Sequence, residues 1–266
     1  MNNMQMQHTL IRTFLLVSGL LVSCLAHADY LLGPGDMVRV TVYGSPDLGT
    51  ETRITQGGTL TFPLLGAVPV GGMSVAQSEK KIASMLEEGG FVKQAQVNIM
   101  VSQFASQQVS ILGDVLKPGR YPLEHASTLI EVLALAGGIS PNGADMVTVL
   151  SGHEGNTEKH DYDLPELLRK GEGVSIMINA NDIIYVPHAP MYYIYGEVQR
   201  PGQFRLERNM TVAQALATGG GLTMRGTERG LRIKRRNAAG VLETIAVKAD
   251  DLLDKDDVLL VRESLF

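Results

Sequence analysis

The densest group of side chains that could bind a ligand is a run of cations near the end of the chain. The stretch TMRGTERGLRIKRRN occupies positions 223–237 and reads as a hairpin. Two interpretations stay open. In the first, the charges keep an exposed sheet edge soluble. In the second, the symmetry of an oligomer arranges them into a basic ring that contacts an anionic polymer or a partner protein. The cations are Arg225, Arg229, Arg232, Lys234, Arg235 and Arg236.

Three tyrosines of one predicted strand could bind sugars by stacking. Successive side chains of a strand point to opposite faces, so Tyr193 and Tyr195 share one face and Tyr192 lies on the other. Core packing is the default interpretation of such a strand. The alternative is that Tyr193 and Tyr195 stack against sugar rings.

No combination of residues predicts catalysis or a metal site. The six histidines lack metal-ligand spacing, and there is no G-x-S-x-G motif. Gly219 to Gly221 end a predicted helix, whereas a phosphate loop would open one. Asp36 could be a catalytic carboxylate, but a role in capping a turn and accepting backbone N–H bonds is favoured. We therefore expect a binding protein with no cofactor and no enzymatic activity.

The composition is that of a globular protein built from small β-rich modules. Hydrophobic residues make up 44% of the 266 positions, and 29 glycines with no tryptophan indicate many tight turns. The net charge of −5 argues against a nucleic-acid partner.

The first 28 residues read as a secretory signal peptide. The apolar run from Thr13 to Leu25 is too short to span a bilayer stably. Cleavage after Ala28 is favoured, and lipidation of Cys24 in a lipobox-like Leu-Val-Ser-Cys sequence is the alternative. Because Cys24 is the only cysteine, the mature chain has no disulfide.

The sequence repeats itself at a constant offset of 83 residues. The segment VSILGDVLKPGRYPLEHASTLIEVLALAGGI at 109–139 aligns without gaps with YYIYGEVQRPGQFRLERNMTVAQALATGGGL at 192–222. Glycines, turn residues and apolar residues coincide, for example Gly113 with Gly196. Two duplicated domains follow from this match.

Each copy reads as strand, turn, strand, helix, hairpin and strand, an α+β module of the β-grasp kind with a helix across a mixed sheet. Pro118-Gly119 and Pro201-Gly202 fit type II turns, which need a positive φ at the glycine. Thr128 and Thr211 occupy helix N-cap positions, and glycine pairs end the apolar helices that follow.

A third module of different design precedes the copies. It contains a turn at Leu32-Gly33-Pro34-Gly35-Asp36, an alternating strand over 37–43 and a helix that starts at Ser74. The predicted organisation is a signal peptide at 1–28, this module at 29–105, a first β-grasp domain at 106–189 and a second at 190–266.

The motifs LGPGDMVRVTVYG at 32–44 and GGTLTFPLLGAVPVGGMSVAQSEKKIASML at 57–86 resemble the polysaccharide export domain of the Wza-like outer-membrane family. The two copies resemble the soluble-ligand-binding (SLBB) β-grasp domains that follow it in that family. The resemblance implies a homo-oligomeric ring, commonly an octamer, that conducts exopolysaccharide or capsule through the periplasm and outer membrane together with an inner-membrane copolymerase.

One departure from the family affects the expected partners. Larger members end in an amphipathic helix that lines the outer-membrane pore, whereas only Arg262 to Phe266 follow the last predicted strand here. We therefore expect a periplasmic protein, associated with the outer membrane, that needs a separate outer-membrane β-barrel as the exit. A soluble glycan-binding adaptor that does not conduct polymer is the alternative function.

Overall fold

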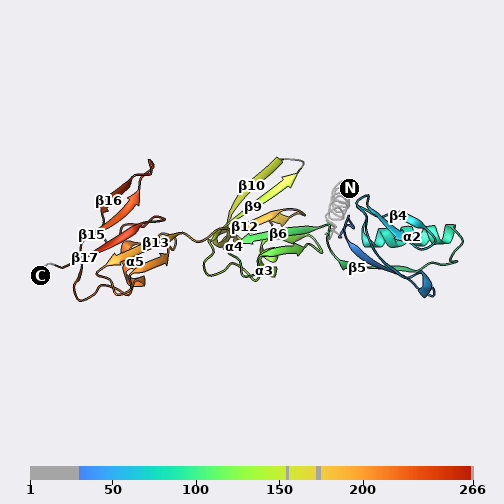
Figure 1. Cartoon of the computed structure of the whole chain (residues 1–266), viewed down its shortest axis with the longest axis horizontal. Coiled ribbons are helices and arrows are strands. Elements are labelled where there is room, and N and C mark those ends of the chain that lie inside the picture. Colours follow the sequence, from blue (N-terminus) through green and yellow to red (C-terminus); the bar gives the residue numbers. More distant parts are fainter. Residues whose placement is uncertain (1–29, 154–155, 172–174, 265–266) are drawn as a thin grey trace, which may run out of the picture. The chain divides into compact units, whose positions relative to one another are not determined.

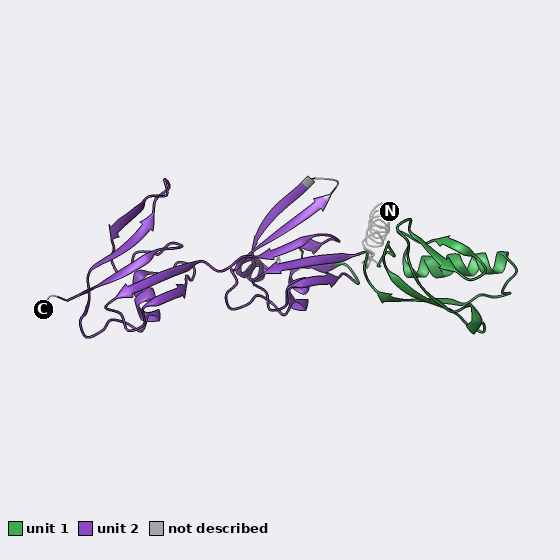
Figure 2. Ribbon diagram, in the orientation of Figure 1, with its two compact units in different colours: residues 1–106, 124–126 green, residues 107–123, 127–266 purple. Residues whose placement is uncertain are grey.

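The computed structural model describes residues 30–153, 156–171 and 175–264. The predicted signal peptide, with both Cys24 and the cleavage site after Ala28, lies outside the described residues. The chain divides into two compact units, residues 1–106 with 124–126 and residues 107–123 with 127–266 (Figure 2).

The first unit is a small α+β domain with a helix packed near a three-stranded antiparallel sheet of order β2-β1-β5 and a hairpin β3-β4 (Figure 1). Its alternating strand buries Val38, Val40 and Val42, as the sequence predicts. The elements are β1 (Met37–Val42), η1 (Pro46–Leu48), β2 (Thr50–Arg53), β3 (Thr59–Phe62), β4 (Gly66–Pro69), α2 (Val75–Glu88) and β5 (Val97–Gln103).

The helix of this unit begins and ends where the sequence places it. The Ser74 hydroxyl accepts a hydrogen bond from the backbone N–H of Gln77, and the Gln77 side chain accepts one from the N–H of Ser74. This reciprocal pair satisfies two backbone donors that the first turn leaves open. Gly90, with φ +71°, ends the helix.

The first copy, in the second unit, has a five-stranded mixed sheet of order β10-β9-β12-β6-β7 with β12 parallel to β6. Its core gathers residues of β6, β9, β12 and α3. The elements are β6 (Gln108–Gly113), β7 (Gly119–Pro122), β8 (Ser127–Thr128), α3 (Leu129–Leu135), β9 (Met146–His153), β10 (Asn156–Asp163), α4 (Leu164–Lys170), β11 (Met177–Ile178) and β12 (Ile183–Val186).

The second copy repeats this topology with the sheet order β14-β13-β17-β15-β16 and the parallel pair β13 and β17. Its core is separate from that of the first copy. The α+β fold class and the β-grasp arrangement of both copies are therefore confirmed. The elements are β13 (Met191–Gly196), β14 (Gly202–Arg205), α5 (Val212–Thr218), β15 (Gly226–Arg236), β16 (Leu242–Ala246) and β17 (Val258–Glu263).

A shared glycine shows how closely the copies correspond. Gly113 has φ +89° and Gly196 has φ +98°. A Cβ atom at either position would lie 2.0 Å from a carbonyl oxygen of the parallel neighbour strand, that of Val186 or Val261. Only glycine fits both the backbone conformation and the space.

The prediction of type II turns at Pro118-Gly119 and Pro201-Gly202 is wrong. Each glycine is the first residue of the returning strand: Gly119 has no positive φ, and Gly202 has a nearly extended φ of +155°. The chain reverses before each glycine, where a backbone hydrogen bond joins the loop to the end of the helix. In the first copy this bond runs from the Lys117 N–H to the Ala136 carbonyl oxygen, at 2.9 Å. A type II turn occurs instead at Gly33-Pro34-Gly35-Asp36, where Gly35 has φ +95°.

The domain boundaries 29–105, 106–189 and 190–266 stay a prediction, because the division into compact units does not separate the two copies.

Candidate functional site

The sheet of the second copy has one buried face and one exposed face. Tyr192 and Ile194 of β13 point to the core that α5 covers and are 0% and 2% exposed. Tyr193 and Tyr195 point the other way, and each keeps 37% of its surface exposed. Core packing therefore describes Tyr192 only. We call the other side, defined by Tyr193, Tyr195, Arg232, Lys234 and Leu260, the open face.

Strand register brings cations beside these tyrosines. Across the sheet Tyr195 pairs with Leu260, and Leu260 pairs with Arg232. Lys234 lies in the neighbouring row, and its Nζ atom is 5.7 Å from the centroid of the Tyr195 ring. An ammonium group at this distance from an aromatic face is held by a cation–π interaction. The open face thus presents aromatic rings and positive charge together.

Two of the six predicted cations are neutralised within the domain. The Arg235 guanidinium donates to both carboxylate oxygens of Asp257, at 2.8 and 2.6 Å, and also pairs with Asp254 at 2.7 Å. Asp257 is fully buried, and its hydrogen bond raises the pKa of Arg235. Arg225 forms an ion pair with Glu263, which raises the pKa of Arg225. Neither arginine is free to take a new anion.

The other four predicted cations stay candidates for ligand contact. None of the ion pairs among the described residues includes Arg229, Arg232, Lys234 or Arg236. Arg236 donates to the carbonyl oxygen of Gly240. Arg232 and Lys234 lie on the open face with the two tyrosines.

Asp36 of the first unit is a buried hub of hydrogen bonds. Its carboxylate is 0% exposed and accepts bonds from the Tyr30 hydroxyl at 2.8 Å and the Gly33 N–H at 2.9 Å. Three more donors come from the end of the unit: the N–H groups of Ala105 and Ser106 at 2.8 and 2.7 Å, and the Ser106 hydroxyl at 2.8 Å. This arrangement supports the structural interpretation of Asp36, because its oxygens are committed to fixing the chain as it leaves the unit.

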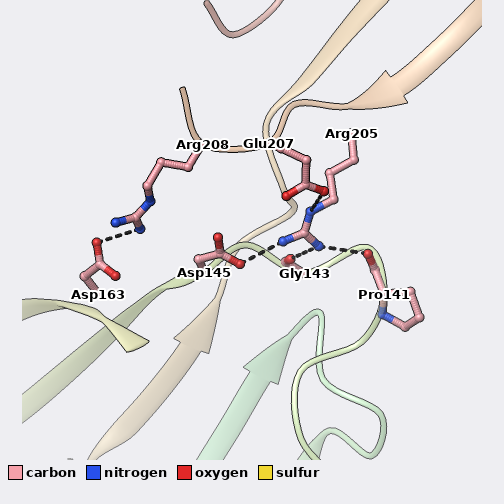
Figure 3. A network of polar contacts seen from close by, with 7 residues as sticks. All are labelled: Pro141, Gly143, Asp145, Asp163, Arg205, Glu207 and Arg208. Atoms are coloured by element: carbon pink, nitrogen blue, oxygen red, sulfur yellow. Dashed lines mark hydrogen bonds and ion pairs between the residues drawn. The ribbon is translucent and has the colours of Figure 1, made fainter. Parts of the chain in front are cut away.

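A second polar cluster joins the two copies within the second unit (Figure 3). Arg205 of β14 donates through Nη1 to the carbonyl oxygens of Pro141 and Gly143, at 3.0 and 2.9 Å. Its Nη2 donates to Asp145 at 2.8 Å, and its Nε lies 3.3 Å from Glu207. We call this arrangement the Arg205 clamp.

The linker between the copies is bound to the same loop of the first copy. The N–H of Ala189 donates to the carbonyl oxygen of Asn142 at 2.7 Å, and the N–H of Ala144 donates to that of Pro187 at 2.8 Å. Arg205 donates to the carbonyl oxygens on either side of Asn142, those of Pro141 and Gly143. The linker and the clamp therefore both bind this loop.

A second ion pair supports the clamp. Arg208 donates to Asp163 at 2.7 Å, which pairs it with the first copy. The pKa of Asp163 is lowered mainly by the backbone N–H of Glu166, which Asp163 caps at the start of α4, and further by Arg208. Sequence reasoning missed Arg205 and Asp145. The alignment of the two copies contains a signal for Arg205, because a cation there replaces Pro122 of the first copy and is therefore specific to the second.

No group of three metal-ligating side chains occurs in the described part of the chain. Likewise, the helices of residues 30–153, 156–171 and 175–264 include none with the length and apolar character needed to cross a bilayer.

Family comparisons agree with this architecture. The family described as polysaccharide biosynthesis/export protein matches residues 25–102, and two models of the SLBB domain match residues 107–186 and 191–246. The export family is a family of transport proteins rather than enzymes.

Curated relatives are distant and longer. The polysialic acid transport protein KpsD of Escherichia coli is 28% identical over 193 residues, which are 71% of this chain and 34% of the relative. The EPS I polysaccharide export outer membrane protein EpsA of Ralstonia nicotianae is 26% identical over 241 residues, 79% of this chain and 62% of the relative. The Vi polysaccharide export protein VexA/TviF of Salmonella typhi is 26% identical over 209 residues, 72% and 57% respectively.

The aligned part thus spans less than two thirds of each of these three relatives. The chain thus has a polysaccharide export domain followed by two SLBB domains, and it is distantly related to these polysaccharide export proteins.

Proposed function

We propose that this protein is a periplasmic, outer-membrane-associated subunit of a conduit that exports exopolysaccharide or capsule. The polymer is driven by its synthesis at the inner membrane, and the protein supplies a closed polar path. An inner-membrane copolymerase is the expected partner on the entry side. The names of the relatives, which transport or export polysaccharide, support a polymer substrate, and the outer-membrane designation of EpsA supports the location.

The observation that carries this proposal is the open face of the second copy. A surface that conducts a glycan must hold sugar rings weakly and repeatedly, and aromatic faces next to cations do this without a closed pocket. Tyr193 and Tyr195 provide the aromatic faces, and Lys234 and Arg232 flank them.

Assembly into a ring, with an octamer suggested by the family resemblance, is part of the same proposal. Tandem modules that expose different surfaces favour head-to-tail contacts between copies, and such contacts close into a ring when the rotation permits. The symmetry would then repeat the open face of each subunit around one axis.

Deleting the gene should stop secretion and cause polymer to accumulate in the periplasm. The reason is that the inner-membrane machinery continues to synthesise polymer that no longer has an exit. The measurement is the amount of polysaccharide in periplasmic, surface and culture fractions, with a strain re-expressing the chain as the control. Unchanged secretion in the deletion strain contradicts the proposal.

Native mass spectrometry of the detergent-solubilised full chain should show a closed oligomer of one size. A sole monomer at micromolar concentration in every detergent tested contradicts the conduit and favours the glycan-binding adaptor instead.

A further inference from the structure

We infer that the open face of the second SLBB domain binds an acidic polysaccharide, with sugar rings on Tyr193 and Tyr195 and carboxylate groups at Arg232 and Lys234. This inference rests on the proposed export function and adds the chemical class of the polymer. It follows from three features of the face: its geometry, its unneutralised charge and its difference from the first copy.

The geometry places both kinds of group within reach of one chain of sugars. One row across the sheet runs from Tyr195 through Leu260 to Arg232, and the next runs from Tyr193 through Val258 to Lys234. Strands in a sheet are about 4.8 Å apart, so each tyrosine lies roughly 10 Å from the cation of its row. A glycan lying across the strands can therefore contact a ring and a cation at the same time.

The surface continues past Leu260 into an open groove. Arg229, Arg262 and Thr227 line that groove together with Glu197 and Glu263. The two carboxylates are already engaged: Glu197 accepts a hydrogen bond from the Thr223 hydroxyl at 2.6 Å, and Glu263 pairs with Arg225.

Within the described residues, no acidic side chain pairs with the two cations of the open face, and Lys234 contacts the Tyr195 ring instead. Arg225 and Arg235 bind Glu263 and Asp257, yet none of the ion pairs within the described residues includes Arg232 or Lys234. The whole chain carries a net charge of −5, so an uncompensated positive patch is not a consequence of overall composition. Exposed cations beside aromatic rings attract carboxylates while the rings take the apolar side of the sugar.

The first copy provides an internal comparison on the same scaffold. Its two rows on this face run Ser110–Ile183–Leu150 and Leu112–Tyr185–Thr148. The equivalents, with the second copy named first, are Tyr193 and Ser110, Tyr195 and Leu112, Lys234 and Leu150, and Arg232 and Thr148.

One cation of the first copy's face, Lys159, is neutralised locally. Lys159 pairs with Asp161 at 2.9 Å, and Asp161 also accepts a bond from the Thr148 hydroxyl at 2.6 Å. The hydrogen bonds from Thr148 and Lys159 lower the pKa of Asp161 and keep it ionised at neutral pH. One fold thus carries two different faces, and only the second has tyrosines at both β13 positions of its two rows and cations at both β15 positions.

The test compares two ligands of the same length and backbone, an oligogalacturonate and its methyl ester, by calorimetric titration of the purified full chain. Esterification removes the negative charge and keeps the sugar. We expect the acid to bind at least about tenfold more tightly, because the sum of several exposed charge contacts reaches the 1.4 kcal/mol that a tenfold change requires. This preference should weaken as salt is added.

The matched variant transplants the first copy's residues into the second: Tyr195→Leu, Arg232→Thr and Lys234→Leu together. The same scaffold already tolerates these residues, so the variant should fold, which circular dichroism checks. Binding of the acid should fall at least about tenfold towards that of the ester. Arg120→Gln, which removes an exposed cation from the first copy, is the control and should change binding less than about twofold.

Several results would overturn the inference. These are equal binding of acid and ester, no binding of either, no effect of the triple variant, and tighter binding of a polyglutamate peptide, which would indicate a protein partner. A triple variant that cannot bind oligogalacturonate but restores normal export to the deletion strain also overturns it and leaves the export function standing. Normal secretion after deletion contradicts the export function itself.

Discussion

Replacing Asp36 by alanine is expected to lower the free energy of unfolding of the first unit by about 3–5 kcal/mol. The carboxylate is fully buried and accepts hydrogen bonds from four residues: Tyr30, Gly33, Ala105 and Ser106. Alanine removes every acceptor at once and leaves backbone N–H groups without a partner. The cost of such orphaned donors is larger than the net value of the bonds themselves.

Urea denaturation followed by circular dichroism measures this loss. Asp47→Ala is the matched control, because Asp47 is an exposed aspartate in η1 of the same unit and should change stability by less than about 0.5 kcal/mol. If both variants unfold at the same urea concentration, the hub does not stabilise the unit.

The hub also gives the LGPGD motif a physical reason. A Cβ atom on Gly33 would lie 2.6 Å from the Ser106 hydroxyl oxygen, so the motif's glycine makes room for the residue that closes the hub. Gly35 supplies the positive φ of the turn, which directs the Asp36 side chain back to the Gly33 N–H. One turn thereby joins the start of the described part of the unit to its last residues.

Much of the fold could be predicted because its signals are local. A threonine or serine before an apolar segment predicts a helix start, and Ser74, Thr128 and Thr211 all prove to be N-caps. Each accepts a bond from the N–H three residues later, and the glutamine or glutamate there bonds back. Internal repetition was equally informative, because it predicts that both copies share one domain fold, and their five-stranded sheets have the same strand order.

The features that sequence reasoning missed depend on tertiary contacts. The cation run 223–237 predicts six similar arginines and lysines, yet Arg235 alternates to the buried side of β15 and meets Asp257. The first copy has the equivalent aspartate, Asp182, but no arginine of its described residues pairs with it. Asp182 is 1% exposed, and its Oδ1 has no hydrogen-bond partner in the described part of the chain. Whether an arginine of a basic run faces a core acid or solvent depends on register, which composition does not specify.

The prediction of type II turns at the two Pro-Gly pairs was wrong for a related reason. Proline followed by glycine is compatible with a type II turn, but it is also compatible with a strand that begins at the glycine. Bonds from Lys117 and Arg200 to the ends of the helices select the second possibility. These bonds join segments that are distant in sequence, so no short window contains them.

Replacing Arg205 by alanine is expected to uncouple the two SLBB domains, with a loss of about 2 kcal/mol in the free energy that holds them together. The guanidinium is the only group of the clamp that contacts Pro141, Gly143 and Asp145 at once among the described residues. Without it, two backbone bonds still join this loop to the linker, from the Ala189 N–H to the Asn142 carbonyl oxygen and from the Ala144 N–H to the Pro187 carbonyl oxygen. The domains themselves should stay folded, since their cores are separate.

Limited proteolysis of the linker at 187–190 measures this coupling, because cleavage follows the population of the open form when opening is fast. A loss of 2 kcal/mol raises that population roughly thirtyfold, and the rate of cleavage with it. Arg205→Lys keeps the charge but not the planar fork that reaches three acceptors, so its rate should resemble that of the alanine variant more than that of the wild type. Arg208→Ala is the matched control: the Arg208 side chain is 51% exposed against 30% for Arg205, and its loss should raise cleavage less than about fivefold. Cleavage of Arg205→Ala at the wild-type rate would mean that the backbone bonds of the linker, and not the clamp, hold the second domain and its open face against the first copy.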